Sequence, residues 1–471
     1  MPARRTFLAR LGAFLALAAS LLLAGCATRP LEDHGRADDG RAHVVFVHGN
    51  GDSGALWQTT VWRFESNGWP TGKLHAIDLP YPLARDEDPR EQPGRTSAAE
   101  HMAYLKAQVE ALVERTGADK VVLVGNSRGG YAIRHYIQNG GGESRVSHAI
   151  LAGTPNHGIW AVKGMRENSE FSGTGPFLTA LNAPKNQRGD EVTHAVKWLT
   201  IRSDNNDKYA QPDGLWIGSG GTPTNVTHAG PELRGATNVI LDGADHRETA
   251  YSPAAFDAMY RFITGAAPRT TEIQPSEKLI LNGTVLGLGL QPDDPTSGNF
   301  VNNLPLRGAR VQVYPVDPDT GERRGQPVHD KVVGRNGRWG PFDAAHGVPY
   351  EFVISAPGYP TNHIYRSPFP RSSYLIHLQA QRRVAVDDDA RAIVTMTRPR
   401  GYFDVGRDKM SFGGISPPPG LPPTGAGISI SKLKATTEEV QPVVAEFNGE
   451  RIVGRTWPAA QNHIVFLELT W

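Results

Sequence analysis

Short apolar runs alternate with segments of helical periodicity from residue 41 to residue 267. The runs have the length and β-branched content of buried strands, and they lie at residues 43–47, 74–79, 121–124, 146–151, 196–201 and 237–241. Polar turns, many of them with glycine, separate the runs from the helical segments. Strands that alternate with helices in this way favour a mostly parallel sheet covered by helices on both faces.

Two helices of this part have clear boundaries in the sequence. The run Ser97-Ala98-Ala99-Glu100 is a capping box, and Gly117 ends the helix that it opens. A last helix begins at Ser252-Pro253 and places apolar residues about one turn apart. Residues 155–195 interrupt the alternation with aromatic and aliphatic side chains among glycines. We expect this insert to arch over the adjacent loops as a lid with an apolar inner face.

Helical periodicity disappears after a proline-containing linker at residues 268–277. Strand-like runs separated by turns follow at residues 278–286, 309–314, 350–354, 374–378, 392–396 and 464–469. We therefore expect an all-β C-terminal region. It comprises a β-sandwich-like domain at 278–381, which resembles the small prealbumin-like sandwiches appended to secreted enzymes, and a second β-rich segment at 382–471. The sequence leaves open whether these form one domain or two.

Composition narrows the range of functions only a little. The chain of 471 residues is long enough for two or three domains, and 21% charged with 39% hydrophobic residues is ordinary for a soluble globular protein. The formal net charge of +1 gives no electrostatic reason to expect binding of nucleic acid. Protein partners and the oligomeric state are not indicated by the sequence.

The N-terminus has the pattern of an export signal. Arg4 and Arg5 precede an apolar run at residues 7–23 that is short for a membrane-spanning helix. We expect a signal peptide over residues 1–26 that ends at Cys26 and is cut on export just before this cysteine. Because the two arginines also resemble a twin-arginine signal, this route and ordinary secretion both stay open.

The signal ends in a pattern that predicts a lipid anchor. Leu23-Ala24-Gly25-Cys26 resembles the lipobox of bacterial lipoproteins, and Cys26 is the only cysteine of the chain. We expect Cys26 to be lipidated and residues 27–40 to be a flexible tether. The protein would then be exported and anchored to a membrane, at the outer membrane, in the periplasm or at the cell surface, with extracellular release as a further possibility.

The most informative motif follows the strand at residues 121–124. It is Gly125-Asn126-Ser127-Arg128-Gly129, and a helical segment at 131–137 comes directly after it. A G-x-S-x-G match between a strand and a helix is typical of a nucleophile elbow, in which the serine is held at the tip of a sharp turn. Ser127 is therefore the candidate nucleophile for attack on an acyl carbon.

Negative charge that develops on an attacked carbonyl needs hydrogen-bond donors. The strand at 43–47 ends in His48-Gly49-Asn50-Gly51, a loop whose backbone N–H groups can point at such a charge. The other donor is expected from the residue after the nucleophile. We predict the backbone N–H groups of Asn50 and Arg128 as the oxyanion hole, and we assign His48 no role in proton transfer.

A serine nucleophile also needs a general base and a carboxylate that orients it. Where the serine lies on such an elbow, the chain order is Ser, then Asp or Glu, then His. His246 follows the last strand of the expected sheet, so we predict it as the base. We prefer Asp207 as the acid because it lies deep in the loop after the preceding strand, with Asp204 capping the turn before it. Asp204 stays the alternative, and Asp242 and Asp245 are weaker because they share the histidine's loop.

These motifs together carry a family resemblance. The four segments 47–51, 125–129, 153–158 and 243–246 look like those of the bacterial and archaeal triacylglycerol lipases of the α/β-hydrolase superfamily. The resemblance covers about residues 41 to 265, and archaeal lipases with a C-terminal β-domain look similar in layout. Many family members carry His where this chain has Asn126, and an apolar or amide residue where it has Arg128. The second departure bears on the polarity of the acyl pocket.

The sequence thus predicts a lipid-anchored serine carboxyl-ester hydrolase that acts on triacylglycerols or related esters. This chemistry needs neither a metal nor an organic cofactor, and the Asp204–Asp207 run lacks the glycine and distal glutamate of a calcium loop. A polyester depolymerase, acting on polyhydroxyalkanoate or cutin, is an alternative with the same chemistry. A non-catalytic surface lipoprotein with adhesive β-domains is an alternative of another class.

Overall fold

The computed structural model describes residues 40–471 except 205, 210–223, 227–228, 289–300 and 424–426. The predicted signal peptide, Cys26 and nearly all of the predicted tether lie outside the described residues. Within the described part of the chain, no helix is long and apolar enough to span a bilayer.

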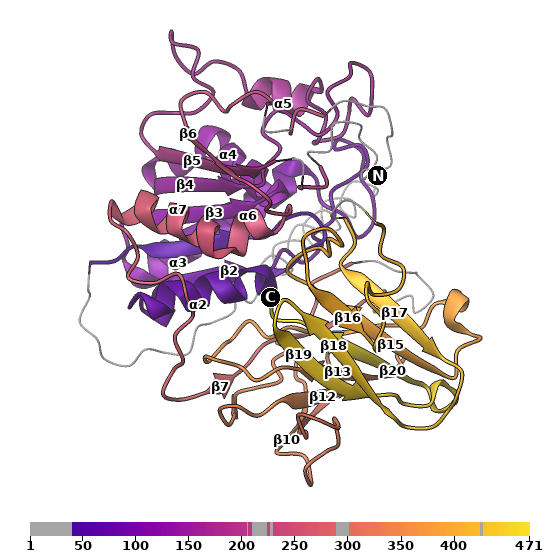
Figure 1. The fold of residues 1–471 in the computed structure, drawn as a ribbon. Helices are drawn as coiled ribbons and strands as arrows, with labels where there is room; N and C mark the ends of the chain where they lie inside the picture. The colour runs from indigo at the N-terminus through magenta and orange to yellow at the C-terminus, as the bar shows by residue number, and fades with distance from the viewer. Residues whose placement is uncertain (1–39, 205, 210–223, 227–228, 289–300, 424–426) are drawn as a thin grey trace, which may run out of the picture.

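Residues 41–267, the α/β part, are built on a six-stranded parallel sheet with the order β2-β1-β3-β4-β5-β6 (Figure 1). Successive side chains of a strand point to opposite faces of the sheet. Because both faces are covered, the central strands are apolar on both. The strands are β1 (His43–Val47), β2 (Leu74–Ile77), β3 (Val121–Asn126), β4 (Val146–Ala152), β5 (Lys197–Ser203) and β6 (Thr237–Leu241). The predicted fold class of this part is confirmed.

Helices cover the two faces of this sheet. One face packs α3 (Ala98–Thr116) and α4 (Arg128–Asn139), and the other packs α2 (Gln58–Ser66), α6 (Glu248–Tyr251) and α7 (Pro253–Thr264). The predicted capping box is present at the start of α3, where the Ser97 side chain and the Glu100 side chain accept each other's backbone N–H. The short helix α5 (Pro176–Leu181) lies in the insert above the sheet.

Residues 278–471, the β region, confirm the expected strand-rich fold. A seven-stranded sheet has the order β10-β9-β12-β13-β20-β15-β17, and smaller sheets are β11-β7, β14-β8 and β16-β18-β19. Their bounds are β7 (Ile280–Leu281), β8 (Val285–Gly287), β9 (Arg310–Pro315), β10 (His329–Val332), β11 (Phe342–Asp343), β12 (Tyr350–Ser355), β13 (Thr361–Arg366), β14 (Leu378–Ala380), β15 (Ala392–Thr397), β16 (Met410–Phe412), β17 (Ile430–Ala435), β18 (Pro442–Phe447), β19 (Glu450–Arg455) and β20 (His463–Glu468).

The large sheet of the β region contains strands of both segments, 278–381 and 382–471, whose division into one domain or two the sequence left open. Strand β20, from the end of the chain, lies between β13 and β15 and pairs with both. Alternate residues of β20 enter two different cores, Ile464 and Phe466 on one face, Val465 and Leu467 on the other. Both faces of this sheet are therefore buried, by β7, β8, β11 and β14 on one side and by β16, β18 and β19 on the other.

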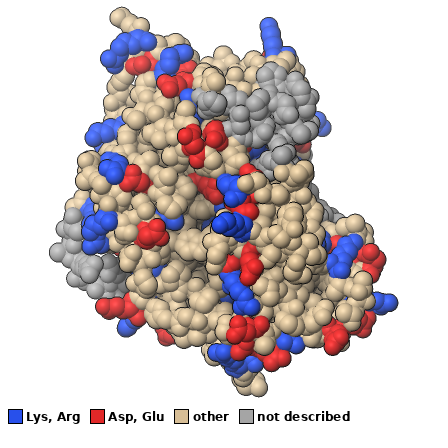
Figure 2. Space-filling view, viewed as in Figure 1, with Lys and Arg blue, Asp and Glu red and all other residues tan. Residues whose placement is uncertain are grey.

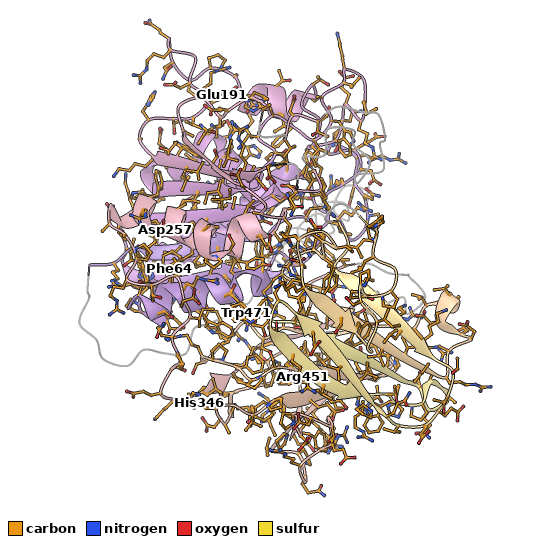
Figure 3. The ribbon with its side chains drawn as sticks, viewed as in Figure 1. Phe64, Glu191, Asp257, His346, Arg451 and Trp471 are labelled. Atoms are coloured by element: carbon orange, nitrogen blue, oxygen red, sulfur yellow. The ribbon has the colours of Figure 1, made fainter. Side chains whose placement is uncertain are left out.

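The α/β part and the β region share apolar cores. Trp62 of α2 is buried in a core of the β region, and its indole N–H donates to the Ser372 carbonyl at 2.8 Å. In the other direction, Tyr374 and Leu375 are buried in the core of the α/β part, where the Tyr374 hydroxyl donates to the Leu74 carbonyl at 2.6 Å. Figure 3 places Trp471 at the junction of the two.

Two segments that the sequence singled out lie at this junction, and one of them differs from its prediction. The run at 374–378 was predicted to be a strand, but only its last residue enters one, β14. Its apolar side chains fill the boundary between the two parts, which an apolar run alone cannot distinguish from a strand. The predicted linker is docked on α2, because the Asn67 side chain accepts the Arg269 N–H and the Ser66 hydroxyl accepts the Gln274 N–H.

Charged side chains do not gather in a patch of one sign on the face shown in Figure 2. Basic and acidic residues are interspersed there, consistent with the formal net charge of +1. The contacts that join the two parts are the shared apolar cores and buried ion pairs such as Arg398–Asp245.

The shared core predicts that the two parts unfold together. Trp62→Ala should lower the free energy of unfolding by about 3–5 kcal/mol, since it leaves a cavity at the boundary. Urea denaturation followed by circular dichroism should show one transition at lower midpoint. Val332→Ala is the control, because this strand residue of β10 is 65% exposed and should change little. Separate transitions, with only one of them moved by Trp62→Ala, would contradict the shared core.

Candidate active site

The candidate residues meet at the carboxyl edge of the parallel sheet. Strands β1 and β3 are neighbours, and β2 lies on the other side of β1. The chain thus turns in opposite directions from β1 and β3, and open α/β sheets place their ligand sites at such a point. The loop after β1 carries Asn50, and the turn after β3 carries Ser127.

Ser127 lies in a strained turn between β3 and α4. Its φ of 52° and ψ of −121° are in a region that favours glycine, and such a conformation in a non-glycine residue costs about 1–3 kcal/mol. The surroundings hold it there, since its N–H donates to the Ala152 carbonyl at 2.9 Å and its carbonyl accepts the Gly130 N–H at 3.0 Å. The side chain is thus fixed at the tip of the turn.

Glycines make this turn possible by close approach. A Cβ on Gly129 would overlap the Val47 carbonyl of β1, and a Cβ on Gly130 would overlap the Thr154 side chain. A Cβ on Gly125 would lie 2.7 Å from the Ile133 side chain of α4. The G-x-S-x-G pattern is therefore explained here by steric exclusion of a Cβ.

His246 and Asp207 lie in direct contact. The His246 Nδ1–H donates to Asp207 Oδ2 at 2.8 Å, and both side chains are buried. The other carboxylate oxygen of Asp207 accepts the Tyr209 N–H at 2.8 Å. The Tyr209 ring packs edge-on against the imidazole with centroids 4.4 Å apart, and burial raises the pKa of its phenol. With Nδ1 committed to the carboxylate, Nε2 is the nitrogen that faces away from it.

The other acidic candidates have different partners. Asp204 accepts the Asn206 N–H at 2.9 Å and the Gly243 N–H at 3.0 Å, so it caps its turn and ties the two loops together. The Asp245 carboxylate is bound to Arg398, and Asp242 is exposed. Among the acids that the sequence proposed, the structure brings Asp207 to the imidazole.

The histidine loop adjoins the serine turn through Asn126. The Asn126 side-chain amide donates to the carbonyls of Ala152 at 3.1 Å and His246 at 3.3 Å. The departure from the histidine found in many lipases thus has a structural role, since this amide joins the loop after β6 to the turn after β3. Among the described residues, the Ser127 hydroxyl forms no hydrogen bond with His246; such bonds in ligand-free sites often tighten only when substrate is bound.

The expected oxyanion donors border Ser127. A Cβ on Gly49 would lie 3.0 Å from the Ser127 Cβ, which shows how closely the loop after β1 approaches. Asn50 holds that loop by accepting the Ala84 N–H on its side chain at 2.7 Å, so its own backbone is fixed. Arg128 is the first residue of α4, where backbone N–H groups have no acceptor within the helix.

The Arg128 side chain is turned into the protein and fully paired. Its guanidinium donates to both Glu170 oxygens, at 2.7 and 2.9 Å, and to Pro82 and Thr96. Burial raises the pKa of the Glu170 carboxyl, and the paired guanidinium opposes that shift. Because the pair is neutral as a whole, Arg128 does not present a free charge to the substrate side. Sequence reasoning missed Glu170, since 42 residues separate the partners.

The Arg128–Glu170 pair also fixes the insert at residues 155–195 to the start of α4. A small core around Tyr131 reinforces this attachment, and the Tyr131 hydroxyl donates to the Pro155 carbonyl at 2.6 Å. Most of the apolar residues that were expected to form the inner face of a lid are buried in that core. They are Trp160, Phe171, Leu178 and Leu181. Val162 of the same insert is exposed.

His48 has a structural place beside the oxyanion loop. The Leu79 N–H donates to its Nε2 at 3.0 Å, so Nδ1 carries the proton and donates to the Gly49 carbonyl at 2.9 Å. Burial lowers the pKa of this imidazole, which keeps it neutral. Its contacts support the loop and leave neither nitrogen free.

Two family models match parts of the chain, one within the α/β part and one over the first half of the β region, and His246 lies outside both. Residues 42–209 match the family described as alpha/beta hydrolase fold, and residues 277–383 match the family described as lipase C-terminal domain. Among curated proteins, a pimeloyl-[acyl-carrier protein] methyl ester esterase of Vibrio parahaemolyticus is 32% identical over 113 residues, 24% of this chain and 37% of the relative. This chain therefore spans about a third of the length of that relative.

Solved structures with partial similarity include two lipases. Aspergillus fumigatus lipase B has 15% identity and a TM-score of 0.36, over 51% of this chain and 57% of that one. Bacillus licheniformis lipase BlEst2 in its propeptide form has 14% identity and a TM-score of 0.35, over 91% and 94% of the two chains. Each of the two family models covers less than half of this chain.

The contact between His246 and Asp207 predicts different effects for two neighbouring acids. Asp207→Asn should lower kcat for an ester by a factor on the order of 10⁴, because the amide favours the wrong imidazole tautomer. Asp204→Asn removes only turn contacts and should change kcat by less than about 10-fold while lowering the melting temperature. Steady-state kinetics on purified variants compare them directly. A large loss for Asp204→Asn with an active Asp207→Asn would reverse the assignment.

Proposed function

We propose that this chain, which combines a domain of the α/β-hydrolase fold family with a lipase C-terminal domain, is a serine carboxylic ester hydrolase acting on triacylglycerols or related acyl esters. The observation that carries the proposal is the buried hydrogen bond between His246 and Asp207, on loops beside the strained Ser127. The similarity of part of the chain to a methyl ester esterase supports the same reaction class.

In the proposed reaction, the Ser127 hydroxyl attacks the ester carbonyl carbon. His246 Nε2 accepts the hydroxyl proton as the new C–O bond forms, while Asp207 holds the imidazole through Nδ1. The tetrahedral intermediate collapses, and the same proton passes to the leaving alcohol. An acyl group is then esterified to Ser127, and water activated by His246 releases the carboxylic acid.

The backbone N–H groups of Asn50 and Arg128 are the proposed donors to the tetrahedral oxyanion. Each donor of this kind lowers a barrier by about 3–4 kcal/mol. The Arg128–Glu170 pair fits this role. Because the guanidinium is bound to Glu170, we expect Arg128 to contact the oxyanion through its backbone N–H.

We further propose that the protein is an exported lipoprotein attached to a membrane through Cys26. The lipobox-like sequence around this single cysteine supports the proposal. An anchor of this kind would hold a lipase close to lipid substrates.

Substitution of Ser127 tests the nucleophile and the strain of its turn together. Ser127→Ala should abolish ester hydrolysis and labelling by a fluorophosphonate with a melting curve close to that of the parent. Ser127→Gly should be equally inactive but more stable than Ser127→Ala by about 1 kcal/mol, because glycine accepts the positive φ. Hydrolysis of p-nitrophenyl esters, labelling and calorimetry measure these effects. Retained turnover or labelling in either variant would refute the role of Ser127.

Lipid attachment is tested in cells that process lipoproteins. The parent chain should incorporate a clickable palmitate analogue and partition with membranes, whereas Cys26→Ser should do neither because it lacks the thiol that is acylated. Labelling of Cys26→Ser equal to that of the parent would exclude Cys26 as the modified residue.

A further inference from the structure

The loop that carries His246 is held by the β region through a buried carboxylate, Asp245. One oxygen of Asp245 accepts the N–H groups of Arg247 at 2.8 Å and Glu248 at 2.9 Å, which fixes the turn directly after His246. The other oxygen accepts a hydrogen bond from the Arg398 guanidinium at 2.8 Å and one from the Tyr402 N–H at 2.8 Å. The same side chain thus shapes the histidine loop and ties it to the β region.

Arg398 is a buried residue just after β15 and is fixed from all sides. Its Nε donates to the Trp471 carbonyl at 3.0 Å, and Nη2 donates to Glu248 at 2.5 Å and to the Tyr251 hydroxyl at 2.9 Å. Trp471 marks the place of this contact in Figure 3, at the junction of the two parts. The guanidinium therefore links the last residue of the chain to α6.

Neighbours of Arg398 contact both loops of the His246–Asp207 pair. Arg407 donates to Glu248 at 2.6 Å and to the Gly243 carbonyl at 2.9 Å, on the histidine loop. The Tyr402 ring lies 4.6 Å from Lys208 Nζ, next to Asp207, and 5.1 Å from the Arg247 guanidinium, next to His246. Residues 398–407 of the β region thus clamp the acid loop and the base loop together.

We propose that Arg398 is a positioning residue for His246, so that the β region holds the general base in register with Ser127. The inference rests on the proposed function. Asp207 fixes the imidazole at Nδ1, and Arg398 fixes the main chain around His246 through Asp245, the residue before it. Misplacement of a catalytic group by about 1 Å, caused by a change outside the chemistry, can lower the rate by on the order of 100-fold. Arg398 itself touches neither Ser127 nor His246.

Removal of Arg398 also has an electrostatic consequence. Without Arg398, the Asp245 carboxylate keeps three backbone N–H donors, from Arg247, Glu248 and Tyr402, and the Arg407 guanidinium at 3.9 Å. The loss of one positive charge beside His246 favours a protonated imidazole, and a protonated imidazole is no general base. The charged and titratable groups that face this loop are Asp52, Asp204, Asp207, Lys208, Tyr209, Arg247, Glu248, Tyr251, Tyr402 and Arg407.

The test compares kinetics of the full chain with Arg398→Gln and Arg398→Lys on a small soluble ester. Arg398→Gln should lower kcat by roughly 10–100-fold with KM changed by less than about 2-fold, and the acidic limb of kcat/KM should move to higher pH. Arg398→Lys keeps the charge and should recover part of kcat with the acidic limb in place. Each rate is divided by the concentration of protein whose serine reacts with a fluorophosphonate, so that unfolded protein does not affect the comparison.

The matched control is Arg323→Gln, which breaks an ion pair with a different buried carboxylate, that of Glu351. Arg323 donates to both Glu351 oxygens, at 2.6 and 3.1 Å. Its guanidinium also lies over the rings of Tyr314 and Trp457, and all of these partners belong to the β region. This variant should lower the melting temperature but leave kcat and the pH profile unchanged.

Each outcome bears on one claim. If Arg398→Gln keeps the parent kcat and acidic limb, or changes both no more than Arg323→Gln does, the positioning role is wrong. If Arg398→Gln does not fold, a kcat of Arg398→Lys equal to that of the parent likewise overturns it. A parent protein that neither hydrolyses esters nor reacts with the phosphonate refutes the proposed function instead.

Discussion

The tight turn that joins β3 to α4 is the constraint on which the candidate site depends. Ser127 occupies a positive φ, and the residues around it leave no space for a Cβ on Gly125, Gly129 or Gly130. Such strain persists only where the surroundings over-determine it. Here the main-chain hydrogen bonds to Ala152 and Gly130 and the close approach of β1 do so. The loops that carry Asn50 and His246 can then be placed relative to one fixed point.

Buried ion pairs hold the insert at residues 155–195 and the β region to the segments around Ser127 and His246. Arg128 joins the start of α4 to Glu170 of the insert, and Arg398 joins the β region to Asp245 of the histidine loop. A buried pair of this kind contributes little net stability, but breaking it by removing one partner costs several kcal/mol. The two pairs therefore chiefly specify one arrangement of segments that lie far apart in the sequence.

Much of this arrangement follows from local sequence rules, and the remainder does not. Alternating apolar runs indicated the parallel sheet, Ser97 and Glu100 marked the start of α3, and the chain order after the elbow pointed to His246 and Asp207. The run at 374–378 was misread because an apolar segment looks alike in a strand and in a plug between domains. Glu170 and Arg398 could not be found, since an ion pair between residues 42 or 153 positions apart leaves no periodic signal. Whether β15 and β20 extend the sheet of the preceding segment is likewise a matter of long-range pairing.

The central claim is that Ser127, His246 and Asp207 act as one unit against an oxyanion held by Asn50 and Arg128. A crystal structure of the full chain after reaction with an alkyl fluorophosphonate tests it most directly. The account predicts phosphorus bonded to Ser127 Oγ, the phosphoryl oxygen within hydrogen-bond distance of both backbone N–H groups, and His246 Nε2 facing the esterified oxygen with Nδ1 still on Asp207. An adduct on another residue, or an imidazole turned away from the phosphonate, would contradict it.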